Sequence, residues 1–64
     1  MIVVMDAKAT EAQIDYVRKK MELWGFGIHF SQGIERTIIG AIGPKRAGIM
    51  ESIEAMDGVE KVVP

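Results

Sequence analysis

The stretch HFSQGIERTIIGAIG, residues 29–43, decides the fold because it joins two strand patterns through a turn. Residues Gln32–Glu35 contain Gly33 and predict a hairpin loop. Residues Arg36–Ile42 predict a strand with apolar side chains at both parities. A strand of this kind needs cover on both of its faces.

The strand before this turn, Gly27–Ser31, alternates in polarity. Ile28 and Phe30 fall on one face, and His29 and Ser31 fall on the other, as in a half-buried strand. His29 is the only histidine in the chain. It and Ser31 therefore either serve the fold or face a group outside this chain.

A strand and a helix are predicted before the hairpin. Residues Ile2–Met5 are an unbroken apolar run, which predicts a strand covered on both faces. Thr10 and Gln13 fit a capping box at the start of a helix. The apolar stripe of this helix recurs at spacings of three, four and three residues, at Ile14, Val17, Met21 and Trp24. Gly25 and Gly27 mark its end.

A second helix and a last strand are predicted after the hairpin. Gly43-Pro44 predicts the start of the helix, because the missing N–H of proline costs nothing at the first helical position. The buried stripe of this helix is predicted at Ile49, Ile53 and Met56. Gly58 ends the helix, and Val59–Val63 predicts the strand.

The order βαββαβ predicts an α+β fold, the ferredoxin-like sandwich, as a single domain over residues 1–64. In this fold a four-stranded antiparallel sheet carries both helices on one face, and right-handed crossovers place the first and third strands in the centre. The face without helices is expected to hold apolar sets such as Val3 with Met5, or Ile39 with Ala41. Because such a patch usually marks an interface, we expect a second copy or another domain to cover it, with His29 and Ser31 beside it.

Composition excludes several classes of protein. The chain has 64 residues, 48% hydrophobic content, no cysteine and a net charge of −1. Without cysteine there are no disulfides, thiolate metal sites or cysteine nucleophiles. The net charge close to zero argues against a domain whose main function is to bind nucleic acid. Asp6 interrupts the first apolar run, and no run approaches the roughly 20 residues of a membrane span. We therefore expect a cytoplasmic protein that contacts neither nucleic acid nor membrane.

No catalytic or metal-binding pattern is present in the sequence. Ser31, His29 and Glu35 are the residue types of a hydrolase triad, but residues two apart on one strand lie side by side with no group to orient the base. One histidine and scattered carboxylates do not form a metal-ligand cluster. The segment Gly40–Arg46 carries two cations before a predicted helix, yet it lacks phosphate-loop spacing. The favoured interpretation is a glycine that fits helix–strand packing together with two solvated cations. The third strand has no aromatic side chain on which an RNA base would stack.

The segments MIVVM, HFSQGIERTIIGAIG and GVEKVVP closely resemble the N-terminal ferredoxin-like regulatory domain of DAHP synthases (3-deoxy-D-arabino-heptulosonate 7-phosphate synthases). The resemblance covers nearly the whole chain and is most specific at Ser31, Gly33 and Glu35-Arg36-Thr37. In that family the domain precedes a (β/α)₈ barrel, which opens the shikimate pathway by condensing phosphoenolpyruvate with erythrose 4-phosphate and uses a divalent metal. A barrel needs roughly 250 residues. The resemblance therefore implies a non-catalytic domain with no cofactor of its own.

The resemblance also implies feedback sensing in aromatic amino acid biosynthesis. Tyrosine or phenylalanine binds where two such domains meet, and the closed pair obstructs the barrel's active site. The implied partners are another copy of the domain, the catalytic barrel and the amino acid. The implied effector contacts are His29, Ser31 and Gly33, and the turn that frames the site is formed by Glu35, Arg36 and Thr37. An imidazole and a hydroxyl suit a phenol or the polar end of an amino acid beside an apolar patch.

Two other functions remain open. A ligand-independent oligomerisation module would use the same apolar face and form a dimer that is indifferent to amino acids. A small enzyme of the acylphosphatase kind shares the strand order. The loop Asp6–Thr10, however, lacks the arginine and glycines that cradle a phosphate.

Overall fold

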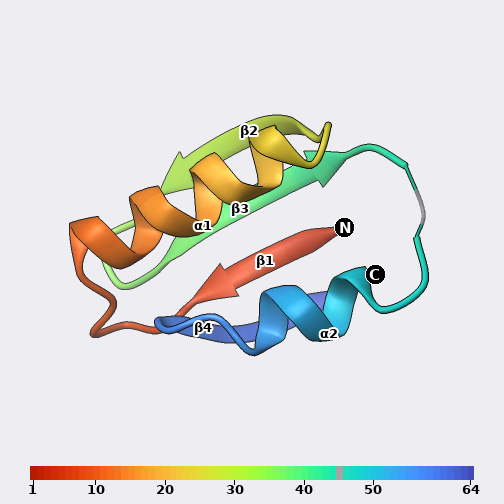
Figure 1. The fold of residues 1–64 in the computed structure, drawn as a ribbon. Helices are drawn as coiled ribbons and strands as arrows, with labels where there is room; N and C mark the ends of the chain where they lie inside the picture. The colour runs from red at the N-terminus through yellow and green to blue at the C-terminus, as the bar shows by residue number, and fades with distance from the viewer. Residues whose placement is uncertain (45) are drawn as a thin grey trace.

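The computed structural model describes residues 1–44 and 46–64 and has the predicted order of elements (Figure 1). The strands are β1 (Ile2–Met5), β2 (Gly27–Gln32), β3 (Thr37–Ile42) and β4 (Val59–Val63), and the helices are α1 (Glu11–Leu23) and α2 (Ile49–Glu54). The strands lie in the order β2-β3-β1-β4, and each neighbouring pair is antiparallel. The ferredoxin-like sandwich with the first and third strands in the centre is confirmed.

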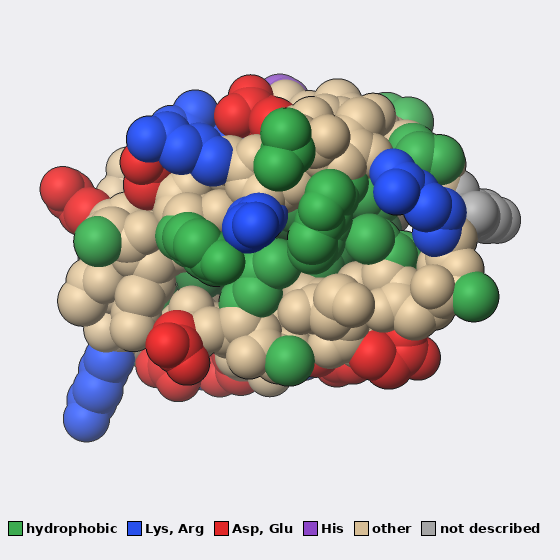
Figure 2. All heavy atoms as spheres, viewed as in Figure 1, with side chains coloured by type: hydrophobic (Ala, Val, Ile, Leu, Met, Phe, Trp, Pro, Cys, Tyr) green, Lys and Arg blue, Asp and Glu red, His purple; other side chains and the backbone are tan. Residues whose placement is uncertain are grey.

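Both helices lie on one face of the sheet, α1 in front of β2 and β3, and α2 in front of β4 (Figure 1). From this side, hydrophobic side chains fill the space between the helices, and acidic side chains gather along the α2 side (Figure 2). The fully buried side chains come from both layers and are Val3, Met5, Val17, Met21, Ile39 and Ile53. Neither of the two described helices is long and apolar enough to cross a membrane.

Both ends of α1 form as the sequence predicts. At its start the Gln13 N–H donates to Thr10 Oγ1 at 3.1 Å, and the Thr10 N–H donates to Gln13 Oε1 at 3.0 Å, which completes the capping box. At its end Gly25 has a φ of 93°, and the Phe26 N–H donates to the Met21 carbonyl at 3.0 Å. This Schellman-type end turns Phe26 back into the core, where it is 7% exposed.

The prediction that the second helix starts at Gly43-Pro44 is wrong. Helix α2 begins at Ile49, and its N-cap Gly48 has a φ of 80°. Because an α-helix cannot contain this left-handed conformation, the helix cannot extend back through Gly48. The predicted stripe does lie on the core side: Ile53 is fully buried, and Ile49 and Met56 pack against the core.

The apolar residues expected on the open face are also the wrong set. Val3, Met5, Ile39 and Ala41 all belong to the core beneath the helices. The alternate positions, Ile2, Val4, Ile38 and Ile42, therefore lie on the face without helices. The prediction that β1 and β3 are apolar on both faces is correct, but packing against the helices selects the opposite parity. On β2, Ile28 packs against the core as expected, whereas Phe30 stays 42% exposed.

Candidate functional site

The open face, defined as the face of the sheet without helices, is a grid of side chains that the strand register sets. One row across the four strands is His29, Gly40, Ile2 and Val63. The next row is Ser31, Ile38, Val4 and Lys61. Polar side chains therefore occupy the β2 edge of this face, and apolar groups occupy its centre.

The polar edge consists of His29 and Ser31. Both are exposed, and two residues along a strand span about 7 Å. Neither side chain forms a hydrogen bond or ion pair with another residue in the described part of the chain. Their donors and acceptors are thus available to a ligand that lies on the open face.

The centre of the open face is an apolar patch formed by Ile2, Val4, Ile38 and Ile42. Val4 is almost covered by its neighbours, but Ile2 is 43%, Ile38 39% and Ile42 86% exposed. Exposed apolar side chains that adjoin one another on two central strands are a common mark of an interaction site. The patch lies directly beside the polar edge, because Gly40 and Ile38 pair with His29 and Ser31.

A shallow hollow lies within this face above Gly40. It has a volume of about 430 Å³ and is lined by eight residues, among them Ile2, His29, Gly40 and Ile42. We call it the Gly40 hollow. Sequence reasoning did not point to a hollow at Gly40, although a glycine in the middle of an apolar strand pattern can mark close approach by another group.

The predicted turn residues Gly33, Glu35, Arg36 and Thr37 lie where β2 joins β3, and they line a small pocket together with residues at the start of α1. Gly33 donates its N–H to the Arg36 carbonyl at 2.9 Å, which closes the turn. The Arg36 guanidinium forms an ion pair with Glu60 of β4, so it reaches across the end of β1, which lies between β3 and β4. Glu35 is exposed, whereas Thr37 is 6% exposed.

The position of Thr37 separates it from the polar edge. Strand alternation places Thr37 on the face opposite Ile38, beneath the helices. Its hydroxyl therefore does not share the open face with His29 and Ser31. The structure places His29 in the lining of the Gly40 hollow, with Ser31 two residues further along the same strand and outside that lining.

The other sequence candidates gain no support as sites. Among the described residues there is no group of three or more His, Asp or Glu that would hold a metal ion. In the segment Gly40–Arg46, Lys45 lies outside the described residues, and the Arg46 guanidinium donates to the Trp24 carbonyl at the end of α1. Arg46 thus serves the end of a helix, where a cation is favourable.

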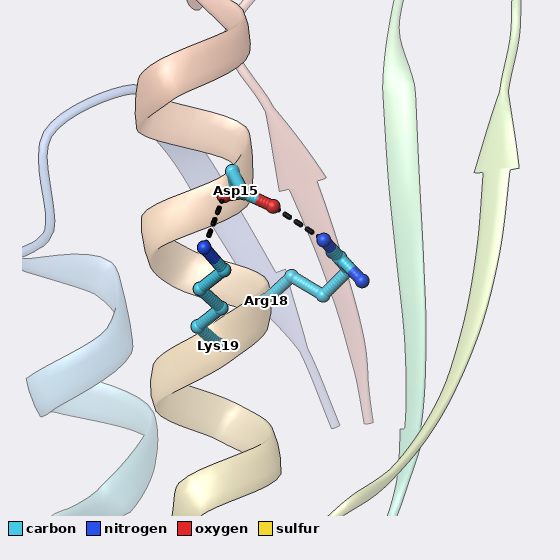
Figure 3. Close-up of polar contacts among 3 residues, drawn as sticks. All are labelled: Asp15, Arg18 and Lys19. Carbon is cyan, nitrogen blue, oxygen red and sulfur yellow. Dashed lines mark hydrogen bonds and ion pairs between the residues drawn. The ribbon is translucent and has the colours of Figure 1, made fainter.

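A polar cluster on α1 lies on the helix side of the sheet. Asp15 accepts hydrogen bonds from Lys19 and Arg18, and the Arg18 side chain extends from the helix toward the strands (Figure 3). The bond from Lys19, followed by that from Arg18, lowers the pKa of Asp15 below its ordinary value of 3.8. The carboxylate in turn raises the pKa of Arg18. All three side chains are partly or largely exposed, so this cluster belongs to the helix surface.

Comparison with known proteins shows what this domain resembles. The family model of the DAHP synthase ferredoxin-like domain matches residues 1–64. A phospho-2-dehydro-3-deoxyheptonate aldolase from Thermotoga maritima is 43% identical over 63 residues, which are 98% of this chain and 19% of that protein. A crystal structure of phospho-2-dehydro-3-deoxyheptonate aldolase (DAHP synthase) from the same organism has a TM-score of 0.86 and 42% identity, over 97% of this chain and 18% of that one. The chain thus spans about a fifth of the length of these relatives.

Proposed function

Because this chain belongs to the family of DAHP synthase ferredoxin-like domains, we propose that it is a regulatory domain that binds tyrosine or phenylalanine between two paired copies. The observation that carries the proposal is the open face, where His29 and Ser31 border an exposed apolar patch. The apolar side chains contact the aromatic ring of the effector. The two polar side chains bind a phenol or the polar end of the amino acid.

The regulated partner in this proposal is a catalytic (β/α)₈ barrel. The matched relatives are aldolases of which this chain covers only about a fifth. We assign the condensation of phosphoenolpyruvate with erythrose 4-phosphate, and the divalent metal it requires, to that partner. The domain contributes no catalytic group and no cofactor. Its part is to pair with a second copy and thereby obstruct the active site of the barrel.

Binding regulates only if the effector prefers the paired domains to the separate ones. Allosteric coupling is typically about 1–3 kcal/mol, or about 5–150-fold in an equilibrium constant. We therefore expect tyrosine or phenylalanine to raise the association constant of the domain pair by a factor in that range. By linkage, pairing raises the affinity for the amino acid by the same factor.

The test is a titration of the ¹⁵N-labelled 64-residue chain with tyrosine and phenylalanine, at concentrations where the domains pair. The amide resonances of His29 and Ser31 should shift, and sedimentation equilibrium should show tighter self-association. Ser31→Ala should weaken binding by about 5–10-fold, because one hydrogen bond contributes about 1 kcal/mol. Ser52→Ala is the matched control, because Ser52 lies on α2 and donates to the Gly48 carbonyl.

The same titration distinguishes the second candidate, a ligand-independent oligomerisation module. The exposed apolar patch by itself is sufficient for that function. A concentration-dependent dimer whose association constant is unchanged by millimolar tyrosine and phenylalanine would support the module and reject the regulatory domain.

A further inference from the structure

Gly40 occupies a costly position for a glycine. It lies in the middle of β3, a central strand that pairs with β2 through His29 and with β1 through Ile2. A glycine here adds no side chain to either face, and it loses more backbone entropy on folding than any other residue. Some property of the position should therefore require it.

The fold of this chain supplies no such requirement. Gly40 does not have a positive φ, unlike Gly25, Gly48 and Gly58. A Cβ at Gly40 would lie 3.5 Å from the His29 carbonyl oxygen and 3.6 Å from His29 Cβ, which are ordinary van der Waals contacts. The pairing of β3 with β2 is continuous through this position, so no bulge explains the glycine. An alanine fits here as far as this chain is concerned.

The remaining explanation is the close approach of a group from outside the chain. The Gly40 hollow lies above this position, with His29 on the β2 side and Ile2 on the β1 side. Its volume of about 430 Å³ lies within the range of about 300–1,000 Å³ that is usual for small-molecule sites. When two sheets pack face to face, their side chains fill a layer about 10 Å thick between them. If the open faces of two copies pack in this way, the missing side chain at Gly40 leaves a gap in that layer that suits a flat group.

We propose that Gly40 is a specificity-determining residue and forms the floor on which the aromatic ring of the amino acid lies, with His29 at its polar border. This assignment rests on the proposed function and adds to it the position of the ring. A methyl group at position 40 fills the space of the ring while leaving the fold intact. Gly40→Ala should therefore separate ligand binding from stability.

The experiment measures tyrosine and phenylalanine binding to the 64-residue chain by calorimetry, for the wild type and two variants that each add one carbon atom, one on the open face and one on the helix side of the sheet. Gly40→Ala adds it inside the hollow and should weaken binding at least tenfold without lowering the melting temperature. Ser52→Thr adds it on α2, on the helix side of the sheet and outside the residues that line the hollow, and should leave affinity within twofold. In the wild type, intermolecular NOEs should join the ring protons to the Gly40 α-protons.

The outcomes separate the two proposals. If the wild type binds neither amino acid while its domains pair, the proposed function fails and the role of Gly40 fails with it. If the wild type binds and Gly40→Ala binds within twofold of it, the regulatory domain stands and the role of Gly40 is rejected. Should Gly40→Ala not fold, the wild-type NOEs decide: contacts to the Gly40 α-protons support the assignment, and ring contacts only elsewhere overturn it.

Discussion

At the scale of single residues, Gly43 shows how closely this small core is packed. A Cβ at Gly43 would lie 2.5 Å from Cδ1 and 3.1 Å from Cα of Phe26, which is closer than van der Waals contact allows. Phe26 is 7% exposed and is held by the end of α1, so its ring has little freedom to move. Glycine is thus required at position 43 by packing alone.

We predict that Gly43→Ala lowers the free energy of unfolding by about 1–3 kcal/mol, the usual cost of an added group in a packed core. Urea denaturation followed by circular dichroism measures this change. Gly27→Ala is the matched control, because its Cβ would meet only the Ile42 carbonyl oxygen at 3.6 Å. We expect that control to stay within about 0.5 kcal/mol of the wild type. Equal unfolding midpoints for the two variants would contradict the packing argument.

At the scale of elements, α1 is stabilised by contacts that lie within a few residues of one another. The hydrogen bonds of the capping box stabilise its first turn, and those of the Schellman-type end stabilise its last turn. The ion pairs of Asp15 with Arg18 and Lys19 lie along its surface (Figure 3). Local contacts of this kind are visible in the spacing of residue types along the sequence. The bonds to Asp15 make the stability of the domain depend on pH, because they require the ionised form of its carboxyl group.

Asp15→Asn should make the stability of the domain less dependent on pH in acid. Because the folded-state pKa of Asp15 lies below its ordinary value of 3.8, its carboxylate stabilises the fold above pH 3.8. This contribution is lost as the pH falls through the lowered pKa. Urea unfolding should find the wild type more stable than the variant at pH 7, and the difference should vanish in stronger acid. Added salt should shrink the difference at pH 7, since the groups are exposed.

Glu54→Gln is the control for this pH series, because Glu54 of α2 forms no ion pair within the described part of the chain. Its stability should follow the wild type across the acid range. A difference between wild type and Asp15→Asn that is constant from pH 7 down to pH 2 would show that Asp15 acts through something other than its charge.

At the scale of the whole molecule, the two faces of the sheet have different cover. The helices and the hydrophobic side chains between them close one face (Figure 2), whereas the apolar patch on the open face has no cover within the described residues. This asymmetry belongs to the fold, because two helices cover only one face of a four-stranded sheet. It makes the open face the expected surface for pairing of two copies.

We predict that Ile38→Lys abolishes concentration-dependent dimerisation in sedimentation equilibrium, because it places a charge within the apolar patch. Leu23→Lys is the matched control. Leu23 lies on α1 and is 76% exposed, against 39% for Ile38, so it has more apolar surface in contact with water but lies on the covered side. The control should dimerise like the wild type. Loss of the dimer in Leu23→Lys but not in Ile38→Lys would place the interface on the helix side.

The sequence by itself determined the order of the elements, the central position of β1 and β3, and both ends of α1. These features depend on periodicity and on residues within about four positions of one another, and they were confirmed. The alternation that separates His29 from Ile28 was also readable, and it placed His29 and Ser31 on the open face. The roles of His29, Ser31, Gly33 and the turn residues in binding an effector remain predictions.

Only the tertiary structure decided which apolar residues the open face carries. Because β1 and β3 are apolar at both parities, periodicity cannot say whether Val3 or Val4 faces the helices, and packing against α1 and α2 made that choice. The ion pair of Arg36 with Glu60 and the hollow above Gly40 likewise join residues that are distant in the sequence. The start of α2 was missed because Gly48 takes a left-handed backbone that its residue type permits but does not impose. Contacts between distant segments select among conformations that local sequence leaves equal in energy.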